Sequence, residues 1–113
     1  MHCFSLILGA RNTPGAGRRF SKKDDAMIRD LTAQHFPAGF TILNAGGGWF
    51  DPARKLFVEE EARQVLICTS SVRALREWCA ALAGALRQKE LLLVELGVAR
   101  TFRYKNPRRL HAG

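Results

Sequence analysis

The sequence lacks both the cysteine spacing of a metal site and a hydrophobic run long enough to cross a membrane. Its three cysteines, Cys3, Cys68 and Cys79, form no CxxC pair and no Cys–His pair at metal-ligand spacing, so we predict no metal site. Because they are odd in number and far apart, we expect three reduced thiols packed as small hydrophobic side chains. The longest apolar stretches reach roughly half the length of a bilayer-spanning helix, so we expect no membrane partner. Residues 1–4 do not resemble the start of a secretory signal, which favours the cytoplasm.

The composition is that of one globular domain. The chain has 113 residues, of which 47% are hydrophobic and 25% charged, values that argue against general disorder. This length suffices for one core and is too short for two. We expect a domain over residues 1–104 and a basic C-terminal tail over residues 105–113.

The positive charge is concentrated in two segments. The net charge is +8, yet all ten acidic residues lie between residues 24 and 99, where eight lysines and arginines leave a charge of about −2. The excess can contact nucleic acid or another polyanion, or it can belong to a solvated loop and a solvated terminus. Nucleic acid is not favoured, because the expected strands lack adjacent aromatic residues for base stacking. The candidate polyanion-binding residues are Arg18, Arg19, Lys22, Lys23, Arg103, Arg108 and Arg109.

Hydrophobic periodicity predicts four strands and two helices. The first helix is expected at about 22–36, where Ser21 is the N-cap and Asp24 completes a capping box. The second follows Ser70 or Ser71 and has the strongest helical pattern, with apolar residues at Val72, Leu75, Cys79, Leu82 and Leu86. Apolar runs rich in β-formers predict strands at 2–9, 40–45, 57–69 and 91–96. The middle two strands form a hairpin with an irregular, protruding tip.

The order β-α-β-β-α-β predicts a ferredoxin-like α+β fold, in which two helices cover one face of a four-stranded antiparallel sheet. Nothing else in 113 residues can cover the other face. The nearly continuous apolar run at 91–96 suggests burial on both faces, as in a central strand. We therefore expect a homo-oligomer, with a dimer favoured.

From Ser5 to Phe102 the chain resembles DUF3574, a family of small bacterial proteins of unknown function. Residues 35–49 (HFPAGFTILNAGGGW) are similar to the family pattern R-F-P-D-G-L-T-V-x-D-A-x-G-x-W, and residues 61–67 and 88–94 resemble two further stretches. His35 replaces an arginine, Ala38 and Asn44 replace aspartates, and Arg63 stands where serine is common. The resemblance implies a ferredoxin-like fold and supplies no established activity.

Glycine and tryptophan mark one candidate ligand site. The glycines at 46–48 could hold a phosphate through bare backbone amides, but they are not followed by the lysine or helix start of a phosphate loop. We favour a bulge or turn that needs positive φ. Trp49 either anchors the hairpin or lines a pocket mouth, and Arg100 could contact an anion. The ligand-binding candidates are Gly47, Gly48, Trp49 and Arg100.

Three residues are candidates for acid–base chemistry: Glu61, His35 and Arg63. Glu61 lies in a run of three glutamates and is expected to be partly buried and paired with Arg63 or Arg100. A buried carboxylate could act as a general base, although a structural ion pair is the better interpretation. His35 lies in the last turn of the first helix, where packing or capping explains it better than catalysis.

Three functions remain open at this point. The favoured one is an oligomeric domain that binds a small ligand, an anion among the candidates, or a protein partner. The alternatives are a small enzyme with a pocket on the sheet face, and a nucleic-acid-binding module. No cofactor is predicted, and the sequence does not decide whether the protein is an enzyme.

Overall fold

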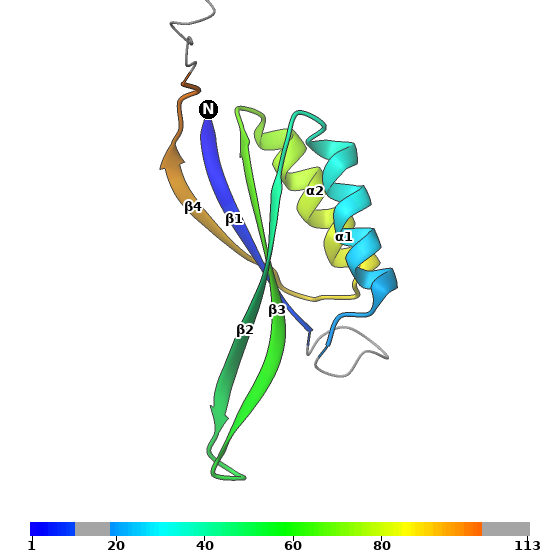
Figure 1. Cartoon of the computed structure of the whole chain (residues 1–113), viewed down its shortest axis with the longest axis vertical. Coiled ribbons are helices and arrows are strands. Elements are labelled where there is room, and N and C mark those ends of the chain that lie inside the picture. The colour runs from blue at the N-terminus through cyan, green and yellow to red at the C-terminus, as the bar shows by residue number, and fades with distance from the viewer. Residues whose placement is uncertain (11–18, 103–113) are drawn as a thin grey trace, which may run out of the picture.

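A computed structural model describes residues 1–10 and 19–102. The elements follow in the order β1 (His2–Gly9), α1 (Lys22–His35), β2 (Thr41–Asp51), β3 (Leu56–Thr69), α2 (Val72–Ala85) and β4 (Leu92–Val98). The strands form one antiparallel sheet in the order β2-β3-β1-β4, and both helices lie side by side on one of its faces (Figure 1). The predicted ferredoxin-like α+β fold is confirmed.

The first helix begins where the capping residues predict. The Ser21 hydroxyl accepts a hydrogen bond from the Asp24 amide at 3.0 Å, and the Asp24 carboxylate accepts one from the Ser21 amide at 2.9 Å. This box satisfies two backbone donors that the helix leaves without an internal partner. In α2 the Ser71 hydroxyl accepts from the Ala74 amide at 3.1 Å, so Ser71 is the N-cap.

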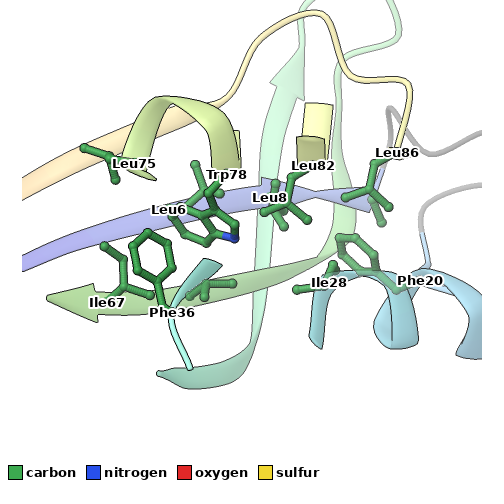
Figure 2. Packing of buried hydrophobic residues seen from close by; sticks show 12 residues of the cluster. Leu6, Leu8, Phe20, Ile28, Phe36, Ile67, Leu75, Trp78, Leu82 and Leu86 are labelled. Atoms are coloured by element: carbon green, nitrogen blue, oxygen red, sulfur yellow. The ribbon is translucent and has the colours of Figure 1, made fainter. Parts of the chain in front are cut away.

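The core lies between the sheet and the two helices. Leu6 on β1 and Val65 on β3 are directly opposite each other and fully buried. Trp78 of α2 is also fully buried and meets Phe36 edge to face, with 5.2 Å between ring centroids (Figure 2). Its indole Nε1 donates to the Thr32 hydroxyl of α1 at 3.0 Å, so the polar atom of the largest core side chain has a partner.

β2 and β3 continue beyond the end of β1 as a two-stranded ribbon. The β1–β3 register ends at Gly9 opposite Ala62, whereas β2–β3 pairing continues to Asp51 opposite Leu56. We call the projecting part, residues 46–61, the arm (Figure 1). The predicted second strand therefore extends well past residue 45.

The glycines at 46–48 lie in regular strand, so the predicted bulge or turn at this position is wrong. They pair without a register shift against Glu61, Glu60 and Glu59, and none of the three is among the glycines with positive φ. At Gly48 the reason for glycine is close approach, because an added Cβ would lie 2.6 Å from the Val58 carbonyl oxygen.

β4 lies at an edge of the sheet, so its predicted central position is wrong. Leu93 packs against the core, but Leu92, Leu96 and Val98 are 59%, 56% and 72% exposed. A continuous apolar run indicates that both faces of a strand are apolar. It does not indicate whether the strand has a neighbour on both of its edges, which is what makes a strand central.

Cys3 and Cys68 form a disulfide, so the prediction of three reduced thiols is wrong for these two residues. They are directly opposite each other on β1 and β3, with Cα atoms 4.0 Å apart. Cys79 is a free thiol, and burial raises its pKa. The bridge joins residues 65 positions apart, and only the strand register brings them together.

Within residues 1–10 and 19–102, neither helix has the length and apolar character needed to cross a membrane.

Candidate functional site

A depression of about 540 Å³ lies where the sheet meets the arm. We call the side of the sheet opposite to the helices the open face, and side chains of this face supply much of the lining. The lining comes from β1, β2, β3 and residues 88–92, which lead into β4, and includes Ile7, Gly9, Gly47, Ala62, Gln88 and Leu92. Four parts of the chain that are distant in sequence thus converge on one hollow.

Two glutamine amides are fixed beside this depression. Gln88, only 7% exposed, donates from Nε2 to the Gly9 carbonyl oxygen at 3.1 Å. Gln64 donates from Nε2 to the Ser5 hydroxyl at 2.9 Å. The Gln88 bond ties the segment after α2 to the end of β1, and the Gln64 bond ties β3 to β1. Both hold the amides in one orientation, which limits the entropy lost when a ligand binds.

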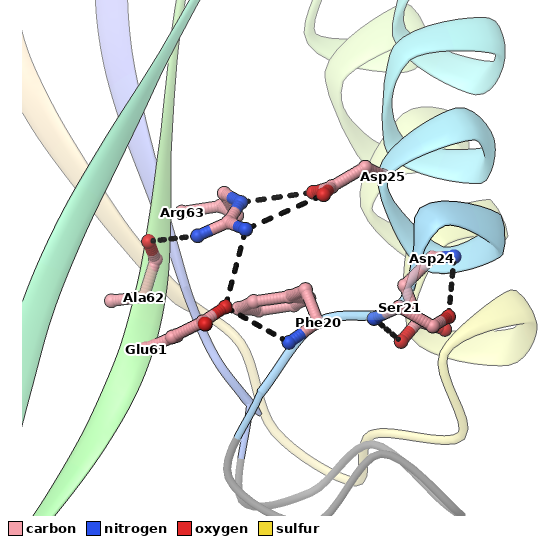
Figure 3. A network of polar contacts seen from close by, with 7 residues as sticks. All are labelled: Phe20, Ser21, Asp24, Asp25, Glu61, Ala62 and Arg63. Carbon is pink, nitrogen blue, oxygen red and sulfur yellow. Dashed lines mark hydrogen bonds and ion pairs between the residues drawn. The ribbon is translucent and has the colours of Figure 1, made fainter.

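Arg63, which lines the depression, is the centre of a polar network (Figure 3). Its Nε lies 2.9 Å from Asp25 Oδ1, and its Nη2 lies 3.3 Å from both Asp25 Oδ2 and Glu61 Oε2. The guanidinium also lies over the Phe20 ring, 4.6 Å from its centroid. The hydrogen bonds that Arg63 donates to the Asp25 carboxylate are the main cause that raises the pKa of Arg63, so the buried arginine keeps its charge.

Glu61 is paired with Arg63, as the sequence led us to expect, and it has a second donor. Its Oε2 accepts from the Phe20 amide at 3.1 Å. The carboxylate therefore connects β3 to the residue that precedes the capping box of α1. This geometry matches the structural ion pair that we preferred to an acid–base role.

His35 lies far from this pair. Its Nδ1 is 2.8 Å from the Leu31 carbonyl oxygen, in the last turn of α1, whereas Asp25 lies in the first turn. Ten residues at 1.5 Å each separate the two positions by about 15 Å along the helix. The structure brings Glu61 and Arg63 together and leaves His35 at the other end of α1.

The ligand-binding candidates are also divided. Gly47 lines the depression, and both Gly47 and Gly48 line a second hollow of about 580 Å³ on the arm. Trp49 pairs with Val58 on the arm and is in the lining of neither hollow. Arg100 is exposed beyond the end of β4, at the opposite end of the sheet from the glycines.

The basic candidates are only partly described. Arg18, Arg103, Arg108 and Arg109 lie outside the described residues. Arg19, Lys22 and Lys23 are exposed and gather at the N-terminus of α1. Cations are unfavourable at this end of a helix dipole, so helix stability does not explain them.

Asp25, Gln64, Gln88 and Gly9 are the site residues that sequence patterns did not indicate. Their roles depend on contacts between segments 38 or more residues apart, for which periodicity has no signal. Within residues 1–10 and 19–102, no group of three or more His, Cys, Asp or Glu side chains is placed to hold a metal ion.

Comparisons with known proteins bear on the fold. No family model matches the sequence, and no curated protein matches it. Among solved structures, the periplasmic divalent cation tolerance protein CutA from Archaeoglobus fulgidus has a TM-score of 0.60 at 10% identity, over 91% of this chain and 89% of that one.

Two further structures are similar. A phage SAM lyase in complex with S-methyl-5'-thioadenosine has a TM-score of 0.54 at 15% identity, over 86% of this chain and 82% of that one. A DUF3240 family protein from Shewanella baltica has a TM-score of 0.53 at 12% identity, over 92% and 97%. At these identities the similarity shows the ferredoxin-like fold alone.

Proposed function

We propose that this protein is a small oligomeric domain that binds a small ligand in the depression at the end of the sheet. The observation that carries the proposal is the depression itself, whose volume of about 540 Å³ lies in the usual range of ligand sites, roughly 300 to 1,000 Å³. Gly47 exposes backbone there and Ala62 adds only a methyl group, whereas the Glu60 carboxylate lies over Gly9. A ligand can therefore approach the strands closely.

The charges at the depression favour an uncharged or cationic ligand over the anion that the basic segments suggested. The charged residues of the lining are Arg63, Glu60 and Glu90. The charge of Arg63 is already matched by Asp25 and Glu61, so little of it is available to an anion. S-methyl-5'-thioadenosine, which is uncharged at neutral pH and is bound by the phage lyase, is the first probe to use.

Isothermal titration with S-methyl-5'-thioadenosine, adenosine and AMP tests the proposal. We expect the uncharged nucleosides to bind more tightly than AMP, and we expect Gly47→Phe to abolish binding by filling the hollow. Gly47 has space for a side chain, so this variant should fold. Thr41→Phe, on the same strand and outside the depression, is the matched control. If Gly47→Phe still binds the nucleosides, the binding site is not this depression. If AMP binds more tightly than the nucleosides, the expected preference for an uncharged ligand is wrong.

We also propose that a second copy of the chain covers the open face. Its exposed apolar side chains, Ile7, Leu43, Leu92 and Val94, are 36% to 59% exposed. Large apolar side chains gathered on one exposed sheet face favour an interaction surface. Sedimentation equilibrium should give a dimer, or a larger assembly, that Leu43→Lys weakens; a monomer at every concentration contradicts the proposal.

Membership of DUF3574 and a cytoplasmic location are further proposals. The first is supported by residues 35–49, which form the end of α1 and most of β2. It predicts that members of the family have a β2–β3 arm at the same position, which a solved member structure would test. Fractionation of cells that express the chain tests the second.

A further inference from the structure

The disulfide between Cys3 and Cys68 joins two strands that are already paired. Phe4 opposite Ile67 and His2 opposite Thr69 flank the bridge in the β1–β3 register. Backbone hydrogen bonds of the ladder therefore hold these strands together whether the bridge is open or closed. The bridge can open without separating the strands.

The bridge can also be reached from solvent. Cys68 is exposed and Cys3 is half-buried, and both alternate along their strands with residues of the helix-covered side. Thiol–disulfide exchange requires an attacking thiolate to reach one of the two sulfurs. Cys68, the more exposed of the two residues, is therefore the expected target.

The sheet is irregular beside the bridge. The β1–β4 register shifts between Cys3 and Phe4, and Cys3 pairs with Gly97, whose φ is +109°. Leu96, the extra residue of this bulge, is 56% exposed. Bulges interrupt the ladder locally and are frequent beside functional sites. The bridge therefore lies beside a bulge in the pairing of β1 with β4.

We propose that Cys3 and Cys68 form a reversible dithiol–disulfide site that exchanges with small-molecule thiols. In the first step, the thiolate of the small molecule attacks Cys68 Sγ, the S–S bond breaks, and Cys3 leaves as a thiolate that takes up a proton. In the second, another small thiol attacks the mixed disulfide and releases Cys68, which is protonated in turn. Two small thiols thus become one disulfide while the protein gains two thiols, and the reverse reaction closes the bridge.

This site lies away from the depression, and the inference does not depend on ligand binding there. It is compatible with the proposed cytoplasmic location, because disulfides in reducing compartments are mainly transient or redox-sensing.

Equilibration of the native protein with mixtures of reduced and oxidised glutathione tests the inference. After acid quenching and alkylation, mass spectrometry counts the free thiols. We expect the count to rise from one, Cys79, to three as reduced glutathione increases, with the far-UV circular dichroism unchanged, and to return to one on reoxidation. A bridge that opens only in guanidinium would overturn the proposal, as would thiols that oxidised glutathione never closes.

Two variants locate the exchange. Cys79→Ser should show the same two-thiol change, because Cys79 is not part of the bridge. Cys3→Ser leaves Cys68 without its partner and should acquire one glutathione on Cys68. A folded Cys3→Ser protein that forms no such adduct contradicts the predicted access to Cys68. If this variant does not fold, Cys68→Ser should acquire one glutathione on Cys3, and a folded Cys68→Ser protein without that adduct contradicts exchange at the bridge.

Discussion

The Arg63 guanidinium donates two hydrogen bonds to the Asp25 carboxylate, from Nε at 2.9 Å and from Nη2 at 3.3 Å. This bidentate contact connects the middle of β3 to the first turn of α1. The Arg63 side chain is 10% exposed and that of Asp25 is 45% exposed. The arginine therefore depends on the pair more than the aspartate does, since a buried charge without a partner is costly.

Removal of Asp25 should destabilise the protein more than removal of an exposed aspartate. Asp25→Ala leaves Arg63 with Glu61 as its remaining carboxylate, and we expect a loss of about 1 to 3 kcal/mol in the free energy of unfolding. Asp30→Ala, which breaks the exposed pair with Arg29, should cost at most about 0.5 kcal/mol. Urea denaturation measures both. Equal losses would show that the Arg63–Asp25 contact contributes no more than a surface pair.

The fold could be predicted because its signals are local. Alternation in strands, the stripe from Leu75 to Leu86 and the capping box at Ser21 each depend on residues close in sequence. The Cys3–Cys68 bridge and the Arg63–Asp25 contact depend instead on strand register and helix docking, which no local pattern encodes. The edge position of β4 was missed for the same reason.

Loss of the hydrogen bond between Trp78 and Thr32 should lower the free energy of unfolding, because it leaves a buried donor without an acceptor. Both residues are fully buried, and Thr32→Val keeps the shape while leaving the indole N–H without its acceptor. We expect a loss of about 1 to 3 kcal/mol, measured by urea denaturation. Thr32→Ser retains the hydroxyl and should lose less than the valine variant. A valine variant as stable as the serine variant would mean that the indole finds another acceptor.

Substitution by alanine should destabilise the arm at Gly48 and not at the adjacent Gly47. An alanine Cβ at Gly48 would lie 2.6 Å from the Val58 carbonyl oxygen, whereas at Gly47 it would meet nothing within 4 Å. The contact at Gly48 is with backbone, so the strands must shift apart, at a cost of about 1 to 3 kcal/mol. Gly48→Ala should speed amide exchange along the arm, and Gly47→Ala should not. Unchanged exchange in Gly48→Ala would show that the arm absorbs the extra carbon.

The positions of Glu61, Arg63 and His35 in the fold could not all be predicted from their positions in the sequence. Glu61 and Arg63 are two residues apart on β3, and their side chains meet at 3.3 Å. His35 is bound to the other end of α1 through its own helix. Residue type suggested all three, but only the packing of α1 on the sheet decides which end of the helix faces the pair.

Cys79 should make the protein less stable in alkaline solution. Burial raises the pKa of its thiol, so the folded state keeps this proton to a higher pH than the unfolded chain does. In the unfolded chain a cysteine titrates at about 8.5. Above that value the unfolded state binds fewer protons than the folded state, and the free energy of unfolding falls as pH rises. Urea denaturation of the oxidised protein from neutral to alkaline pH should show a steeper decline in the wild type than in Cys79→Ala. Other titrating groups are common to both proteins and cancel in the comparison, so parallel curves would mean that Cys79 titrates alike in the folded and unfolded states.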